Sequence, residues 1–115
     1  MSKKIKTLKN LQKILSKKKR KNKKKIVLCH GVFDLLHIGH IKHFREAKSK
    51  GDILVVTVTP DKFVSKGPNR PIFSLNTRME AISELDCVDF VAPNITSNAI
   101  KPIINLKPNF YCKVR

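Results

Sequence analysis

Two histidines three positions apart are the residues of this sequence best suited to chemistry. His37 and His40 stand in the stretch GVFDLLHIGH, residues 31–40. Side chains three residues apart on a helix lie about one turn apart, so both imidazoles can project from the same side of a helix start. Two imidazoles aimed at one anion could donate hydrogen bonds to charge that develops on a phosphorus centre.

The glycines of this stretch suit the same chemistry. Gly31 carries no Cβ, so the backbone can turn sharply there and approach a ligand. Gly39 can admit a close neighbour at the start of the helix that follows. Free backbone N–H groups and the positive end of the helix dipole would attract phosphate. The stretch therefore predicts an anion site.

Other interpretations of the histidines stay open. The pair could bind zinc, although no cysteine is near in the sequence and the third ligand would have to be an acid such as Asp34. The four histidines of residues 30–43 could instead be ordinary polar residues of a helix surface. No local signature of a serine or cysteine nucleophile accompanies them.

The elements that must position these residues alternate along the chain. Apolar, β-branched runs predict strands, and helical spacing with capping residues predicts helices. The predicted strands are residues 26–30, 52–60, 87–93 and 109–114, and the predicted helices between them are residues 41–51, 74–86 and 97–107. We therefore expect an α/β, Rossmann-like, doubly wound parallel sheet with helices on both faces. Its ligand site should lie at the carboxyl ends of the strands, where residues 31–40 leave the first strand.

The N-terminal region has a composition of its own. Thirteen of the 25 Lys and Arg residues lie within residues 1–25, whereas all eight Asp and Glu residues lie after them. Apolar residues at three- and four-residue steps predict an amphipathic helix over residues 5–15. The run KKKRKNKKK, residues 17–25, predicts a solvated linker because its like charges repel. We therefore expect a basic N-terminal helix and linker, residues 1–25, followed by a folded domain, residues 26–115.

Composition narrows the class of protein. A chain of 115 residues can form one domain with a core. Cys29, Cys87 and Cys112 form no C-x-x-C pair and are typical of buried thiols in a reducing cytosol. The sequence holds no apolar run of roughly 18 residues and no apolar secretion segment. We expect a soluble, cytoplasmic protein that does not bind a membrane.

The stretch GVFDLLHIGH resembles the first signature of the cytidylyltransferase-like nucleotidyltransferases. The later text GDILVVTVTPDKFVSKGPNRPIFSLNTRMEAISELDCVDFV, residues 51–91, extends this resemblance. It is most similar to the nucleotidyltransferase part of ADP-heptose synthases and related sugar-phosphate enzymes. Glycerol-3-phosphate cytidylyltransferases share the first signature but resemble the loop at residues 65–71 less well. The resemblance covers the chain from about residue 26 to its end.

This resemblance implies a nucleotidyltransferase that uses CTP or ATP. A phosphate oxygen of a sugar or polyol phosphate would attack the α-phosphorus, and pyrophosphate would leave without a covalent intermediate. Since both substrates are anionic, positioning and charge neutralisation would carry most of the catalysis. Mg²⁺ is expected to arrive with the nucleoside triphosphate, and no metal site on the protein itself is expected.

The resemblance also implies roles for single residues. His37 and His40 would stabilise the transition state at the α-phosphate, and Lys66 would bring a cation to the triphosphate or the acceptor phosphate. The residues expected to bind nucleotide are Gly31, Val32, Phe33, Asp34, Gly39 and Arg78. Among these, Asp34 would hold the turn rather than perform acid–base work.

Three of these residues have structural alternatives. Lys66 could be a solvated loop cation, and Phe33 could belong to the core. Arg78 could form an ion pair with Glu80 or Glu84 on its own helix.

The end of the sequence departs from the family. After YCK the relatives continue with a further strand and a second signature rich in Ser and Thr, and this sequence ends at YCKVR. We therefore expect a C-terminally truncated domain with an exposed edge strand at residues 109–114. Such a chain would bind nucleotide weakly and turn over little. The exposed strand makes a homodimer a candidate assembly.

The basic region supports a rival hypothesis, a non-catalytic nucleic-acid-binding or interaction module. Its cations would attract phosphate backbones non-specifically and with strong salt dependence. However, the run has no interleaved aromatic residues for stacking on single strands and no groove-reading helix motif. We favour a lysine-rich linker and do not expect a nucleic-acid partner.

Overall fold

The structure is a computed structural model that describes residues 2–64 and 70–114. The predicted site residue Lys66 lies outside the described residues, so its role stays a prediction. In the described part of the chain, no helix is long and apolar enough to cross a membrane.

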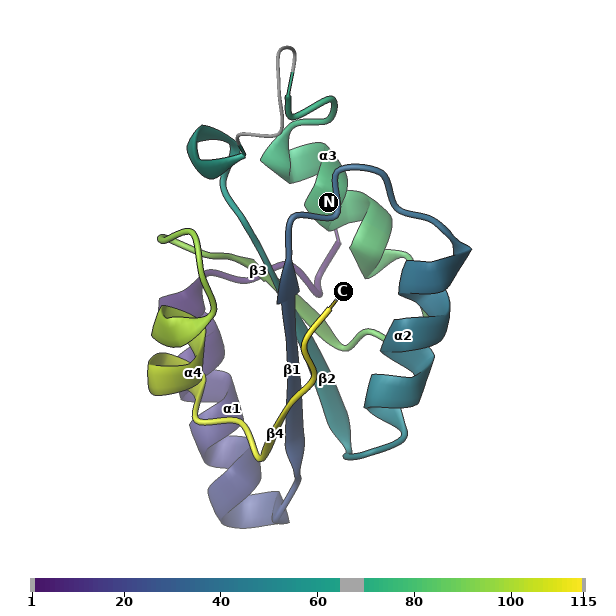
Figure 1. The fold of residues 1–115 in the computed structure, drawn as a ribbon. Helices are drawn as coiled ribbons and strands as arrows, with labels where there is room; N and C mark the ends of the chain where they lie inside the picture. Colours follow the sequence, from purple (N-terminus) through teal and green to yellow (C-terminus); the bar gives the residue numbers. More distant parts are fainter. Residues whose placement is uncertain (1, 65–69, 115) are drawn as a thin grey trace.

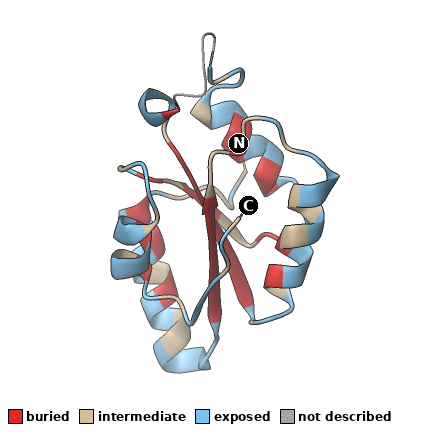
Figure 2. Cartoon of the chain, in the orientation of Figure 1, coloured by how far each residue is buried: buried red, intermediate tan, exposed pale blue. Residues whose placement is uncertain are grey.

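Four parallel strands form one sheet in the order β3-β2-β1-β4 (Figure 1). The strands are β1 (Ile26–Gly31), β2 (Ile53–Val58), β3 (Phe90–Pro93) and β4 (Phe110–Tyr111). The two central strands, β1 and β2, are almost wholly buried, as Figure 2 shows. Burial on both faces explains why their sequences are continuous apolar runs instead of alternating ones.

Helices cover both faces of this sheet (Figure 1). They are α1 (Leu8–Asn22), α2 (Ile38–Lys48), α3 (Leu75–Ser83) and α4 (Ile100–Leu106), with a short 3-10 turn, η1 (Asp61–Phe63). Phe44 of α2 and Ile82 of α3 belong to one core cluster, on one face of the sheet. Leu11 of α1 and Leu106 of α4 belong to a second cluster, on the opposite face. The predicted α/β, doubly wound parallel sheet is thus confirmed.

Helix α1 is longer than the sequence pattern predicts. Thr7 begins it, because its hydroxyl oxygen accepts a hydrogen bond from the Asn10 N–H at 3.2 Å. The helix then runs 15 residues and ends at Lys23, whose backbone is left-handed. The linker predicted from residue 17 onward is therefore wrong as far as Asn22.

Packing of its first half explains why α1 persists through a run of like charges. Leu8, Leu11 and Leu15 are buried against the sheet, so tertiary contacts stabilise the helix where local repulsion opposes it. Cations in the last turn also lie at the negative end of the helix dipole. Both effects favour helix beyond the last buried leucine.

The residues before α1 extend the sheet. The Lys6 N–H donates to the Val91 carbonyl and the Val91 N–H donates to the Lys4 carbonyl, both at 2.9 Å. Ile5 and Val91 form the resulting parallel bridge. The N-terminal segment therefore covers the open edge of β3, and the basic region packs directly on the rest of the fold.

The C-terminal elements are shorter than predicted. Pro102 lies in the first turn of α4, where a missing N–H leaves no helix hydrogen bond unmade. Strand β4 has two residues, at the sheet edge, and both Phe110 and Tyr111 are 41% exposed. The predicted exposed edge strand is confirmed, and a homodimer through it stays a prediction.

The cysteines are buried to different degrees. Cys29 on β1 is fully buried, whereas Cys87 and Cys112 are half-buried, and all three are free thiols. Burial, with smaller effects of the other two cysteines, raises the pKa of Cys29 to about 12. The Cys29 thiol therefore stays protonated and has no nucleophilic role.

Candidate active site

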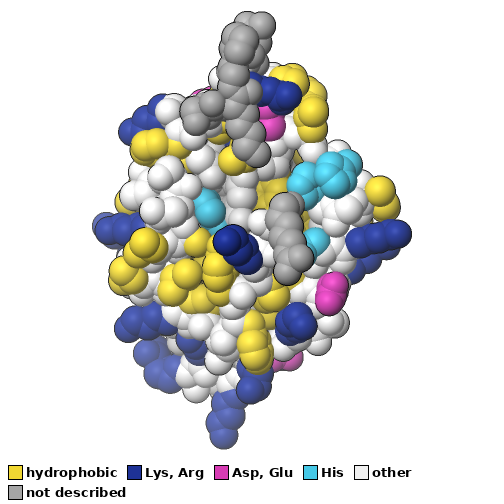
Figure 3. Space-filling view, viewed as in Figure 1, with side chains coloured by type: hydrophobic (Ala, Val, Ile, Leu, Met, Phe, Trp, Pro, Cys, Tyr) yellow, Lys and Arg dark blue, Asp and Glu magenta, His cyan; other side chains and the backbone are white. Residues whose placement is uncertain are grey.

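The loop that carries the two histidines leaves the carboxyl end of β1 and enters α2, as the sequence predicts. A cavity of about 240 Å³ lies on one side of it, lined by Val32, Phe33, Asp34, Leu35, His37, His40, Val64 and Arg70. A second cavity, of about 410 Å³, also touches both histidines and extends along α2 to the C-terminal segment. Figure 3 shows a cluster of histidine side chains over the start of α2. This end of the sheet is where ligands bind in doubly wound folds.

His37 and His40 cap α2 reciprocally. His37 is the N-cap residue, and its Nδ1 accepts a hydrogen bond from the Gly39 N–H at 3.0 Å. His40 Nδ1 in turn accepts from the His37 N–H at 3.2 Å. This arrangement is a capping box built from imidazoles, and the three-residue spacing of the pair is what allows it.

The capping hydrogen bonds determine which ring nitrogens carry protons. A nitrogen that accepts a hydrogen bond from a backbone N–H carries no proton, so a neutral ring must carry its proton on Nε2. Both His37 and His40 meet this condition. Their ring centroids lie 4.1 Å apart, so the pair presents two neighbouring N–H donors to one ligand.

The electrostatic surroundings of His40 favour its neutral form. Burial, followed by the nearby positive charges of His37 and His43 when protonated, lowers the pKa of His40. His40 is therefore neutral at pH 7 and keeps Nδ1 free to cap the helix. His43 lies one turn further along α2, and its buried Nε2 has no hydrogen-bond partner among the described residues.

Gly39 is required by the ring of His37. A Cβ atom at position 39 would lie 2.7 Å from His37 Cε1, closer than side-chain atoms approach. Only glycine therefore allows the His37 ring to fold back over the helix start and cap it. A steric requirement therefore explains the glycine at position 39, in addition to the ligand access that the sequence suggests.

Phe33 supports the pair from the core. Its ring is 5% exposed, and it packs edge-on against His40 with 5.4 Å between centroids and against Phe44 with 5.2 Å. Its backbone is left-handed, with φ of 54°, which is strained for a residue with a side chain. A Cβ at Gly31 would lie 2.8 Å from this ring. Phe33 is thus a core residue that also touches the site.

Asp34 ties the loop to the segment before α3. Its carboxylate accepts hydrogen bonds from the Ile72 and Phe73 N–H groups, both at 3.0 Å, and from Arg70 Nη1 at 2.9 Å. Although desolvation raises it, these hydrogen bonds lower the pKa of Asp34 to about 2. The carboxylate is ionised at neutral pH and holds two segments together, which fits the predicted structural role of holding the turn.

Arg78 is deeply buried, and its guanidinium is bound on all sides. It is 2% exposed, and it donates to the carbonyls of Val32 at 2.7 Å, Thr59 at 2.8 Å and Phe73 at 3.1 Å. It also forms an ion pair with Asp61 at 2.6 Å, and not with Glu80 or Glu84 as the structural alternative supposed. Arg78 therefore joins the ends of β1 and β2 to α3, and its predicted contact with nucleotide stays untested.

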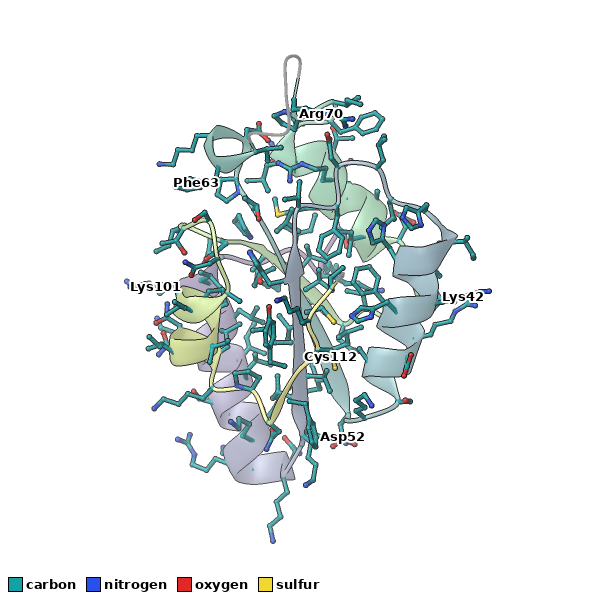
Figure 4. The ribbon with its side chains drawn as sticks, viewed as in Figure 1. Lys42, Asp52, Phe63, Arg70, Lys101 and Cys112 are labelled. Carbon is teal, nitrogen blue, oxygen red and sulfur yellow. The ribbon has the colours of Figure 1, made fainter. Side chains whose placement is uncertain are left out.

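Two partners in this network carry no pattern that would have revealed them in the sequence. Arg70, which contacts Asp34, belongs to a loop with no periodicity, and Asp61 belongs to the short turn η1. Figure 4 shows Arg70 above the carboxyl end of the sheet. The buried imidazole of His30, on β1, hydrogen-bonds Thr57 Oγ1 at 2.9 Å. Burial lowers the pKa of His30.

The zinc interpretation finds no support in this geometry. Among the described residues, no group of three or more His, Cys, Asp and Glu side chains is placed to hold a metal ion. Asp34, the third ligand considered above, is already bound by three donors. The interpretation as ordinary surface histidines is also weakened, because His37 and His40 hold the helix start through specific hydrogen bonds.

Comparison with known proteins gives a consistent result. The family model described as Cytidylyltransferase-like matches residues 28–112. The chain is 44% identical over 91 residues to the bifunctional protein HldE of Hydrogenovibrio crunogenus, which is 77% of this chain and 19% of that protein. It is 41% identical over 105 residues to HldE of Helicobacter pylori, which is 90% of this chain and 22% of that protein. The chain thus spans about a fifth of the length of these relatives.

A solved structure supports the same assignment. The lipopolysaccharide core biosynthesis protein from Thermoplasma volcanium superimposes with a TM-score of 0.70 and 39% sequence identity. The match covers 76% of this chain and 72% of that one. The predicted resemblance to cytidylyltransferase-like enzymes, and among them to ADP-heptose synthases, is confirmed. With the family match running from β1 past β4 and the histidine pair at its first loop, this chain belongs to the cytidylyltransferase-like family of nucleotidyltransferases.

Proposed function

We propose that this chain carries the site that binds a nucleoside triphosphate, CTP or ATP, and transfers its nucleotidyl group to the phosphate of a sugar or polyol. An oxygen of the acceptor phosphate attacks the α-phosphorus, and the bond to the pyrophosphate leaving group breaks. The observation that carries this proposal is the reciprocal capping of α2, which occupies both Nδ1 atoms, leaves both Nε2 atoms free to donate and holds the two rings 4.1 Å apart.

The residues of the loop have distinct roles in this reaction. His37 and His40 donate to the oxygens of the α-phosphate, where negative charge increases in the transition state. The N-terminal end of α2 adds its dipole to the same region. Phe33 fixes the position of the His40 ring, and Asp34 fixes the loop relative to the segment before α3. Rigid positioning matters because both substrates are anionic and react directly.

Mg²⁺ is proposed to enter with the triphosphate. This ion is usually held by phosphate oxygens, waters and one or two carboxylates, so it does not require a preformed cage of protein ligands. The carboxylates nearest the loop, Asp34 and Asp61, are both paired with arginine side chains. The donor set around the site therefore fits a metal that the phosphates hold. When bound, the ion would neutralise phosphate charge.

The acceptor class is proposed from the relatives. HldE is the ADP-heptose synthase to which the sequence is similar, and the structural neighbour is described as a lipopolysaccharide core biosynthesis protein. These descriptions favour a phosphorylated sugar over a polyol phosphate. That this chain shares the activity of the longer relatives is part of the proposal.

Isothermal titration of CTP and of ATP, each with Mg²⁺, into the full chain tests the proposed site. The variant His37→Ala/His40→Ala should lose at least about tenfold in affinity, because both donors are removed. Lys42→Ala, an exposed cation on the same helix, is the matched control and should bind as the parent does. Circular dichroism confirms that each variant is folded.

Either of two results would contradict the proposal. One is equal binding by the parent and the double histidine variant, and the other is absence of binding by the folded parent. Pyrophosphate release with CTP or ATP and a panel of sugar 1-phosphates or glycerol 3-phosphate then identifies the base and the acceptor.

A further inference from the structure

The positive charges of residues 17–25 are displayed on an ordered surface. The run holds eight Lys and Arg residues and no acid, and its first six residues form the end of α1. Six of the eight cations are exposed, and Lys18 and Lys19 are half-buried. Lys19 donates to the carbonyl of Lys107, so the end of α4 adds a further exposed cation beside the helix. We call residues 17–25 together with Lys107 the basic end.

The acidic side chains of the described residues neutralise little of the positive charge of the basic end. Within residues 2–64 and 70–114, the ion pairs are Lys48–Asp89, Arg70–Asp34 and Arg78–Asp61, and none involves the basic end. Asp52 is the adjacent acid, and it accepts the backbone N–H of Lys25 at 2.8 Å. Like charges three and four residues apart, such as Lys17 and Lys21, destabilise a helix by about 0.2–0.5 kcal/mol per pair. A polyanion bound there would relieve this repulsion.

The basic end lies away from the candidate active site. It leads directly into Ile26 at the amino end of β1, whereas the histidine loop begins where β1 ends. Six residues of strand separate the two by about 20 Å, at about 3.3 Å per residue. Figure 4 places Asp52 at the lower end of the sheet and Arg70 above its upper end. The cations therefore do not serve the nucleotide site.

We propose that the basic end is a surface that binds the phosphate backbone of nucleic acid without sequence specificity. The sequence analysis favours a solvated linker for residues 17–25, whereas the structure has helix as far as Asn22, so the cations of residues 17–22 have fixed backbone positions. Non-specific binding to phosphates requires neither stacking aromatic residues nor a groove-reading helix. Figure 3 shows Lys and Arg side chains gathered around the lower end of the molecule. A row of exposed cations on a helix surface suits an extended polyanion, whereas a small anion would need enclosure on several sides.

A membrane surface fits this helix less well. Amphipathic helices bind lipid through an apolar face that enters the acyl boundary. The apolar face of α1, formed by Leu8, Leu11 and Leu15, is buried against the sheet. Only electrostatic attraction would remain for a lipid headgroup, while nucleic acid binding needs nothing more than that attraction.

Fluorescence anisotropy with labelled DNA and RNA duplexes of about 20 base pairs tests this surface. The patch variant is Lys17→Gln/Arg20→Gln/Lys21→Gln/Lys24→Gln, and all four positions are exposed. The control variant, Lys9→Gln/Lys42→Gln/Arg45→Gln/Lys101→Gln, removes the same charge from exposed positions elsewhere. Glutamine is a good helix former, so both variants should fold. Deletion of residues 1–25 is unsuitable because it would uncover one face of the sheet.

The parent should bind duplexes of unrelated sequence at about 50 mM salt and bind them much more weakly at about 200 mM. The patch variant should bind at least about tenfold more weakly at low salt. Its plot of log affinity against log salt concentration should be shallower, by about 0.9 for each phosphate that the protein no longer neutralises. The control variant should change much less. Equal weakening in both variants, or no binding by the parent, would overturn the proposal.

Vesicles rich in phosphatidylglycerol provide the competing test. Binding of the parent to these vesicles, abolished in the patch variant, together with no binding to either duplex would overturn the proposal in favour of a membrane partner. Duplex binding that depends on the patch, with weaker binding to vesicles, supports it.

Discussion

The two ends of β1 carry surfaces that are specified in different ways. At the carboxyl end, Gly31, Phe33 and Asp34 each have specific neighbours that determine the residue type. At the amino end, the cations of residues 17–25 share a single property, positive charge on an exposed surface. The candidate active site therefore depends on individual residues, whereas the basic end depends on the total positive charge of its cations.

The physical reason is the range of the forces involved. Hydrogen bonds and steric contacts act within about 3 Å and weaken steeply with angle, so a residue of the wrong shape removes them. Coulomb interactions between exposed charges extend over about 8–10 Å at moderate salt, so one cation can substitute for its neighbour. Single substitutions should thus have large effects at the carboxyl end and small effects at the amino end.

Substitution of Arg78 should give the largest effect. Arg78→Met leaves three buried or partly buried carbonyls without their donor, and we expect the free energy of unfolding to fall by about 3 kcal/mol or more. Urea denaturation followed by circular dichroism measures this change. Asp61→Asn is the comparison variant: it keeps an acceptor beside Arg78 but removes the negative charge from a pair whose cation is buried, so it should cost about 1–2 kcal/mol, less than Arg78→Met. Similar stability of Arg78→Met and the parent would contradict the structural role.

Alanine substitutions at two glycines should distinguish an effect on nucleotide binding from an effect on stability. Gly39→Ala pushes on the His37 ring, which can rotate away, so we expect at least about tenfold weaker nucleotide binding with a stability loss of about 1 kcal/mol. Gly51→Ala, at the amino end, places a Cβ 2.7 Å from Val27 Cγ2 and 3.0 Å from the Lys25 carbonyl oxygen. It should cost about 1–3 kcal/mol without changing nucleotide affinity. Titration calorimetry measures the nucleotide affinity of both variants, and thermal denaturation measures their stability. Equal nucleotide affinity in the two variants would contradict a specific role of Gly39 in nucleotide binding.

Asp34→Asn should have a smaller, pH-dependent effect. Because the pKa of Asp34 is lower in the folded chain, the Asp34 carboxylate is protonated at higher pH in the unfolded chain than in the folded one. The stability that Asp34 contributes is therefore complete above about pH 4 and is lost as the pH falls toward about 2. The variant should lose about 1 kcal/mol at pH 7. It should also show a weaker decline of stability between about pH 4 and pH 2, measured by urea denaturation at several pH values. An unchanged acid dependence would show that Asp34 is not the titrating group.

Lys17→Gln should give the smallest effect. Removing one charge relieves repulsion from Lys21 and should raise the free energy of unfolding by less than about 0.5 kcal/mol. The gain should shrink at high salt, where exposed charges are screened. Lys101→Gln on α4 has no cation three or four residues further along and serves as the matched control. A loss of stability above about 1 kcal/mol at Lys17 would show that this residue has a specific partner.

Local patterns explain what could be predicted of the fold and the site. The order of the four strands and of the helices between them follows from the spacing of apolar residues, and the pair His37 and His40 belongs to a motif whose members cap each other three residues apart. Such interactions lie within one helical turn, so the sequence displays both partners side by side. The prediction of a linker at the run of lysines is wrong as far as Asn22, because the leucines that hold α1 pack against strands distant in the sequence.

The sequence by itself determined the alternation of strands and helices, the placement of the histidine loop at a carboxyl end and the membership of the family. The tertiary structure decided which polar groups hydrogen-bond to one another. Arg78 donates to Val32 from 46 residues away, and Asp34 accepts from Arg70 across 36 residues. No periodicity encodes such partners, because only the folded topology brings them within about 3 Å.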